Sequence, residues 1–89
     1  MQPVLIYTKR YCPYCALAKS HLTRLGVPFR EIDVTSDAHR EAEMRARSGR
    51  RTVPQIFVGD THVGGSDDLI AAIASGRFSE LVHGQSQAA

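Results

Sequence analysis

The stretch Cys12-Pro13-Tyr14-Cys15 comes shortly after an apolar run, Val4-Leu5-Ile6-Tyr7-Thr8. The apolar run is rich in residues that favour strands, so it predicts a β-strand. A helix is expected to begin near Cys12, because a proline in the first helical turn loses no hydrogen bond. Gly26 marks the expected end of that helix, since glycine readily adopts the conformation that follows a last turn.

The cysteines of this stretch are the only two in the chain. Cys15 begins a 3-4-3 series with Ala18, Leu22 and Leu25, which places all four on one helix face. We therefore expect Cys15 at the head of the buried stripe and Cys12, at the helix entrance, to be more exposed. Two thiols at this spacing can form and break a disulfide reversibly.

The remaining segments continue an alternation of strands and helices. We expect a strand at 29–34, a helix from Ser36 or Asp37 to Ser48-Gly49, a hairpin of strands at 55–58 and 61–63, a helix capped by Ser66 that ends before Gly76, and a last helical turn that places Phe78, Leu81 and Val82 in the core. A strand, a crossover helix and a second strand imply a parallel pair. The order β-α-β-α-β-β-α then predicts an α/β fold in which a four-stranded mixed sheet carries helices on both faces. A Cys-x-x-Cys after the first strand of such a pattern is typical of a thioredoxin-like fold.

Length and composition indicate one small domain spanning residues 1–89, with a core at about 4–82 and a flexible tail at 84–89. The sequence has no apolar run long enough to span a membrane, and its N-terminus lacks the basic region and cleavage site of a signal peptide. These features predict a cytoplasmic protein. In the cytoplasm a Cys-x-x-Cys pair is usually redox-active or metal-binding rather than a structural staple.

Arginines cluster in the middle of the chain, at Arg40, Arg45, Arg47, Arg50 and Arg51. A solvated helix face is the simplest interpretation of this cluster. Acidic residues lie among the arginines and no aromatic residue does, which argues against a nucleic-acid partner. A positive rim that attracts a small anion is the third interpretation.

The position of Cys12 predicts a nucleophile. The free N–H groups and the dipole at a helix N-terminus stabilise a thiolate, so we expect a depressed pKa for Cys12. Cys15, buried one turn later, is expected to resolve a mixed disulfide on Cys12. A zinc site normally needs four ligands. No metal is expected, because the histidines show no ligand-like spacing; they are His21, His39, His62 and His83.

Two further motifs suggest ligand contacts. In Thr52-Val53-Pro54, the proline either simply initiates a strand or is cis and exposes the backbone of Val53 to an extended, peptide-like ligand. In Gly64-Gly65-Ser66-Asp67-Asp68, a glycine turn leads into a capped helix, which is a sufficient explanation by itself. The same motif would also suit a ligand with an α-amino and an α-carboxylate group, because the helix N-terminus offers N–H groups and the aspartates offer negative charge.

Together these motifs, in this order and at these separations, resemble a dithiol glutaredoxin of the small bacterial type. The resemblance extends from Val4 to Val82 and also includes Tyr7-Thr8-Lys9. It implies a thioredoxin fold with glutathione as reductant and ligand, and no tightly bound cofactor. The implied glutathione contacts are Lys9 and Tyr14 near the sulfur and the glycine carboxylate, Thr52 and Val53 beside cis-Pro54 for the cysteinyl part, and Asp67 and Asp68 for the γ-glutamyl end. Arg47 and Arg51 in particular are expected to attract this anionic tripeptide.

The predicted function is therefore glutathione-dependent thiol–disulfide oxidoreduction. The expected substrates are glutathionylated proteins, which need Cys12 alone, and disulfide-containing proteins, which need Cys12 and Cys15. We expect a monomer with neither nucleic-acid nor membrane partners. Two alternatives remain open from the sequence: a redoxin that takes electrons from thioredoxin reductase, and a module that binds a [2Fe–2S] cluster through Cys12 and glutathione. Pro13 argues against the cluster, because cluster-binding relatives usually lack a proline directly after the first cysteine.

Overall fold

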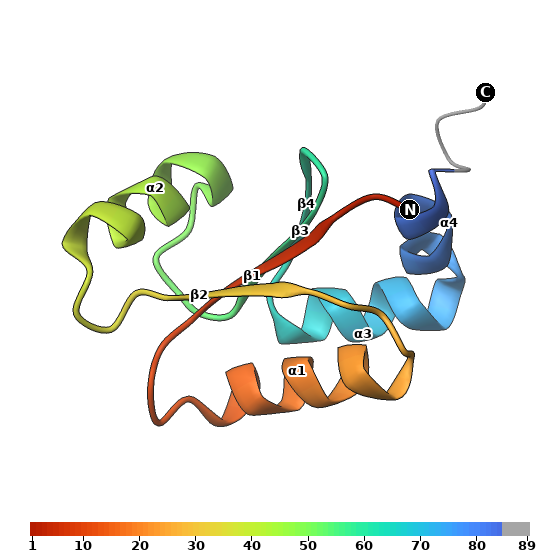
Figure 1. The fold of residues 1–89 in the computed structure, drawn as a ribbon, viewed down its shortest axis with the longest axis horizontal. Helices are drawn as coiled ribbons and strands as arrows, with labels where there is room; N and C mark the ends of the chain where they lie inside the picture. Colours follow the sequence, from red (N-terminus) through yellow and green to blue (C-terminus); the bar gives the residue numbers. More distant parts are fainter. Residues whose placement is uncertain (85–89) are drawn as a thin grey trace.

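The computed structural model describes residues 1–84, and most of the expected tail at 84–89 lies outside this range. Strands and helices alternate in the first part of the chain, and a hairpin of two strands and then two helices follow (Figure 1). In chain order the elements are β1 (Val4–Thr8), α1 (Pro13–Arg24), β2 (Arg30–Asp33), α2 (Ala38–Ser48), β3 (Gln55–Val58), β4 (Thr61–Gly64), α3 (Ser66–Ser75) and α4 (Arg77–His83). None of the helices in the described part of the chain has the length and apolar character needed to cross a bilayer.

The strands form one four-stranded sheet in the order β2-β1-β3-β4. β1 runs parallel to β2 and antiparallel to β3, and β3 pairs antiparallel with β4. The mixed sheet and its thioredoxin-like topology confirm the expectation from the sequence. Because β1 and β3 are central, the segments that follow β1 and precede β3 meet at one end of the sheet.

Side chains of β1 alternate between two apolar layers, as the pleat of a strand requires. Val4 and Ile6 face the layer of α1, α3 and α4, where they pack with Leu22 and Leu69. Tyr7 faces the opposite layer, which α2 closes with Met44. Helices therefore cover both faces of the sheet, with α2 alone on one side in Figure 1.

Several boundaries differ from those expected, among them the end of β4, which includes Gly64. β2 ends at Asp33 because its carboxylate accepts a hydrogen bond from the backbone N–H of Thr35 (2.8 Å), which turns the chain away. Gly65, not Ser66, is the N-cap of α3, and the Asp68 carboxylate reaches back to the Gly65 N–H (2.9 Å). The expected last turn is a separate helix, α4, whose buried side chains do close the core as predicted: Phe78, Leu81 and Val82.

Leu22 is fully buried between α1 and the sheet. We expect Leu22→Ala to lower the free energy of unfolding by about 2–5 kcal/mol, because the truncation removes apolar contacts and leaves a cavity. Leu17→Ala on the same helix is the control, since Leu17 is 42% exposed and should cost less than about 0.5 kcal/mol. Urea denaturation of both variants measures the difference, and equal losses would contradict this packing.

Candidate functional site

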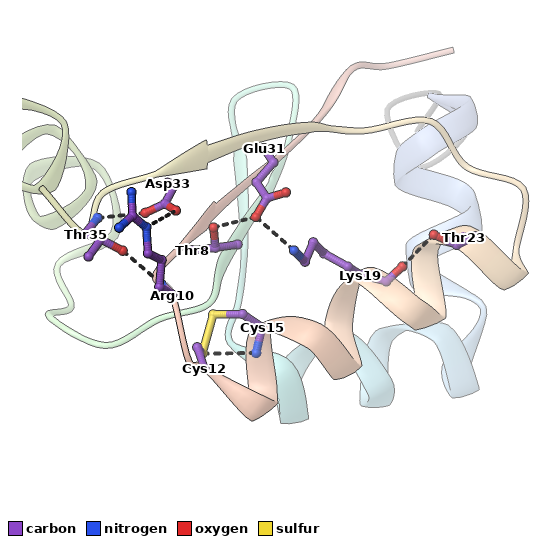
Figure 2. Close-up of polar contacts among 9 residues, drawn as sticks. All are labelled: Thr8, Arg10, Cys12, Cys15, Lys19, Thr23, Glu31, Asp33 and Thr35. Carbon is purple, nitrogen blue, oxygen red and sulfur yellow. Dashed lines mark hydrogen bonds and ion pairs between the residues drawn. A yellow bond between two sulfur atoms is a disulfide. The ribbon is translucent and has the colours of Figure 1, made fainter. Parts of the chain in front are cut away.

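Cys12 is the N-cap residue of α1, and Pro13 occupies the first turn, as the sequence predicted. The connection from β1 is anchored to the end of β2, because the backbone N–H of Arg10 donates to Thr35 Oγ1 (2.8 Å) and its guanidinium lies 4.0 Å from Asp33 (Figure 2). The backbone N–H of Cys15 points at Cys12 Sγ, 3.1 Å away. A helix N-terminus thus delivers an N–H group to the Cys12 sulfur, as an anionic thiolate requires.

Cys12 and Cys15 form a disulfide, with their Cα atoms 5.2 Å apart. Cys12 is partly exposed, whereas Cys15 is only 2% exposed, which confirms the expected asymmetry. Only Cys12 is therefore accessible to a bulky partner. On the side of Cys15, Glu31 accepts hydrogen bonds from Thr8 Oγ1 (2.7 Å) and Lys19 Nζ (3.0 Å) (Figure 2).

An open cavity of about 330 Å³ lies beside this disulfide, and most of the residues that the sequence singled out line it. The carbonyl oxygen of Val53 is 3.9 Å from Cys12 Sγ, so the sulfur lies next to the cavity wall. The Val53–Pro54 peptide bond is cis. The lining comprises Tyr14, Arg50, Thr52, Val53, Pro54, Gly65, Ser66, Asp67 and Asp68.

Charges of both signs line this cavity. Asp68 Oδ2 accepts a hydrogen bond from Arg50 Nη1 (2.9 Å) as well as the one from the Gly65 N–H. The Gly65 N–H, followed by the Arg50 guanidinium, holds the pKa of Asp68 below its ordinary value. The side chain of Asp67 forms no hydrogen bond or ion pair with another residue of the described range 1–84. The cavity can therefore receive both an ammonium and a carboxylate.

Lys9 lies apart from this cavity. It lines a second groove, of about 510 Å³, on the side of Cys12 where Lys19 and Glu31 are found. Its Nζ atom pairs with Glu41 (3.0 Å), and this contact lowers the pKa of Glu41. Cys12 is thus flanked by the two openings, one with Val53 and Asp68 and the other with Lys9.

The glutaredoxin family model matches residues 4–63, which contain the cysteine pair, the Val53–Pro54 segment and most of the sheet. This chain belongs to the glutaredoxin family.

Named relatives are similar in sequence to this chain over nearly its whole length. A glutaredoxin of Pseudomonas aeruginosa is 48% identical over 82 residues, which cover 92% of this chain and 98% of the relative. Glutaredoxin 3 of Escherichia coli is 49% identical, over 92% of this chain and 99% of the relative. The solution structure of a Brucella melitensis glutaredoxin is 51% identical with a TM-score of 0.81, covering 92% and 89% of the two chains. A crystal structure of a buckwheat glutaredoxin–glutathione complex is 28% identical with a TM-score of 0.83, covering 96% and 80%.

Glutaredoxins are glutathione-dependent thiol–disulfide oxidoreductases, and this chain is such an enzyme. Of the expected ligand-binding residues, the structure gathers all but Lys9 around one cavity. Arg50 belongs to the arginine cluster, but the sequence favours Arg47 and Arg51 within that cluster and does not distinguish Arg50 as the arginine of the cavity. Arg47 instead stacks on Phe57 (4.2 Å to the ring centroid) and donates to the hydroxyl of buried Tyr7 (3.0 Å).

The depressed pKa of Asp68 predicts a pH-dependent contribution to stability. A carboxylate whose pKa is lowered in the folded state stabilises the protein above its unfolded-state pKa of about 3.9 and loses this effect as the pH falls through the lower, folded-state value. We therefore expect Asp68→Asn to be less stable than wild type at pH 7 and the difference to shrink below about pH 4. Denaturation of wild type and Asp68→Asn at pH 7 and at low pH measures this difference. A pH-independent difference for Asp68→Asn would contradict the assignment.

Proposed function

We propose that Cys12 is the nucleophile and Cys15 the resolving thiol of this glutaredoxin. The Cys12 thiolate attacks the glutathione sulfur of a protein–glutathione mixed disulfide, the protein leaves as a thiol, and Cys12 becomes glutathionylated. A second glutathione thiolate attacks this new disulfide, which regenerates Cys12 and releases oxidised glutathione. For a disulfide within a protein, Cys12 forms the mixed disulfide with that protein, and Cys15 displaces the protein by forming the Cys12–Cys15 disulfide.

We propose that glutathione occupies the cavity that contains Val53 and Asp68. The backbone of Thr52 and Val53, beside cis-Pro54, pairs with the cysteinyl part, while Tyr14 packs near the sulfur. Asp67 and Asp68 hold the ammonium of the γ-glutamyl end, and the N-terminus of α3 faces its carboxylate. Arg50 adds positive charge for an anionic ligand. Lys9 contacts the glycine carboxylate from the neighbouring groove.

One observation carries this proposal: Cys12 Sγ is 3.9 Å from Val53 O, at the wall of a cavity lined with both signs of charge. An extended ligand whose sulfur is joined to Cys12 would run along Val53 toward Asp68. The protein part of the mixed disulfide would then lie over the second groove, beside Lys19 and Glu31.

The choice of reductant tests the proposed function. We expect rapid, saturable reduction of a small mixed disulfide with glutathione, NADPH and glutathione reductase, and negligible turnover with thioredoxin reductase and NADPH alone. The physical reason is that the cavity offers paired charges to a zwitterionic tripeptide. Turnover with thioredoxin reductase and none with glutathione would overturn the proposal.

The proposal includes a monomeric, cytoplasmic protein that forms a single domain and holds no tightly bound cofactor. A cytoplasmic location is supported by the redox chemistry, because this disulfide is reduced in turnover by a glutathione pool. Partners are glutathionylated or disulfide-containing proteins rather than nucleic acid or membrane. In support, four of the five arginines of the central cluster engage partners within the described part of the chain: Arg40 with Glu43, Arg45 with Glu41, Arg47 with Tyr7 and Arg50 with Asp68.

A further inference from the structure

Gln55 is a fully buried polar residue at the start of β3, directly after Pro54. Its side-chain amide turns back to the segment before the proline. Nε2 donates to the carbonyl oxygen of Thr52 (3.0 Å) and to Thr52 Oγ1 (3.2 Å). The amide nitrogen of Gln55 is therefore committed to Thr52, which is itself an exposed residue at the cavity.

His62, on the neighbouring strand β4, completes the arrangement. Its Nε2 atom lies 2.7 Å from Gln55 Oε1. Since the Gln55 nitrogen faces Thr52, its oxygen faces the histidine, and His62 must carry a hydrogen on Nε2 to donate. The His62 ring also packs on Phe57, with ring centroids 4.9 Å apart.

Burial, followed by the nearby positive charge of Arg50, lowers the pKa of His62, while the carboxylate of Asp68 acts in the opposite direction. Neutral His62 is therefore the form present at neutral pH. The hydrogen bond to Gln55 then fixes which of the two neutral tautomers forms.

We propose that Gln55 and His62 are positioning residues that hold Thr52 and Val53 in the conformation that receives glutathione. The inference rests on the proposed function of this cavity. Thr52 and Val53 belong to the connection between α2 and β3, and the contacts from Gln55 fix the Thr52 carbonyl and hydroxyl from within the protein. A preformed backbone lowers the ordering cost of binding an extended ligand. Neither positioning residue touches the reacting sulfur, so the effect falls on glutathione binding rather than on the chemical step.

Steady-state kinetics with glutathione and a small mixed disulfide test whether Gln55 and His62 position this segment. We expect Gln55→Met and His62→Phe to raise KM for glutathione about three- to tenfold, as loss of one buried hydrogen bond predicts, with kcat within about twofold. His62→Phe retains a ring against Phe57 and removes only the donor. His62→Gln, which presents an N–H at an equivalent distance, should restore KM toward the wild-type value. Thr61→Val on the same strand is the matched control and should leave KM unchanged.

Nitrogen NMR of wild-type His62 provides a readout that needs no variant. We expect the Nε2–H tautomer at neutral pH. An Nδ1–H tautomer would overturn the proposed positioning role. An unchanged KM in both Gln55→Met and His62→Phe, while wild type saturates with glutathione, would overturn it as well. If KM rises only together with a matching loss of folded protein, the role is structural and the proposal also fails. If wild type does not saturate with glutathione, the proposed function itself is contradicted, and the positioning role that rests on it falls too.

Discussion

Cys12→Ser is expected to abolish glutathione-dependent reduction of a mixed disulfide, with a loss of about a thousandfold or more. A serine hydroxyl at this position is not ionised at neutral pH and cannot exchange with a disulfide. Cys12 is also the only cysteine of the pair with an exposed approach, because Cys15 is 2% exposed. The coupled assay with glutathione reductase measures the loss directly.

Cys15→Ser is the matched variant for this experiment. We expect it to retain activity on a protein–glutathione mixed disulfide, which needs Cys12 alone, and to lose activity on a disulfide within a protein, which needs both thiols. Activity that survives in Cys12→Ser, or that disappears equally for both substrates in Cys15→Ser, would contradict the assigned roles.

Gly64→Ala is expected to damage binding more than any other single methyl addition near the site. Gly64 ends β4 with φ of +123°, a conformation that disfavours other residues. A methyl group there would lie 2.6 Å from Cγ and 2.7 Å from Cβ of Asp68, so Asp68 must move. That movement breaks its contacts with Gly65 and Arg50. We expect KM for glutathione to rise about tenfold or more and stability to fall by about 2 kcal/mol, from backbone strain and the lost cap.

Gly26→Ala separates these two effects. Gly26 also has a positive φ, +69°, but an added methyl group meets nothing within 4 Å. We expect a stability loss of about 1 kcal/mol from strain alone and an unchanged KM. Denaturation and steady-state kinetics on the two variants make the comparison, and equal KM values would show that Asp68 does not contribute to binding.

Much of the fold followed from local patterns. The apolar, strand-favouring run Val4–Thr8 predicts the first strand, and the spacing of Cys15, Ala18 and Leu22 predicts the buried helix face, because both signals depend on local geometry. α3 begins one residue earlier than the sequence predicts. Serine is a common N-cap residue, which favours Ser66 from the sequence. In the structure Gly65 takes the extended N-cap conformation, and its N–H donates to the carboxylate of Asp68, three residues further on.

The site was only partly predictable, because some of its contacts depend on how distant segments meet in three dimensions and not on a local pattern. Tyr14, Val53 and Asp68 lie in recognisable motifs, and the fold brings them together. Arg50 resembles its neighbours in the arginine cluster, and only the three-dimensional turn after α2 distinguishes the arginine that meets Asp68 from Arg47, which packs on Phe57. The Gln55–His62 contact joins two strands across a hairpin, and no single-sequence pattern signals a buried hydrogen bond of that kind.

The cysteinyl and γ-glutamyl parts of glutathione joined to Cys12 are expected to lie in the cavity along Val53 and not in the groove beside Lys19 and Glu31. The most direct measurement is NMR of the Cys15→Ser protein carrying glutathione in disulfide linkage to Cys12. We predict intermolecular nuclear Overhauser contacts from the cysteinyl protons to Val53 and from the γ-glutamyl protons to the first turn of α3 at Asp67. Contacts to Lys19 and Glu31 instead, with Val53 and Asp67 unperturbed, would contradict this placement of glutathione.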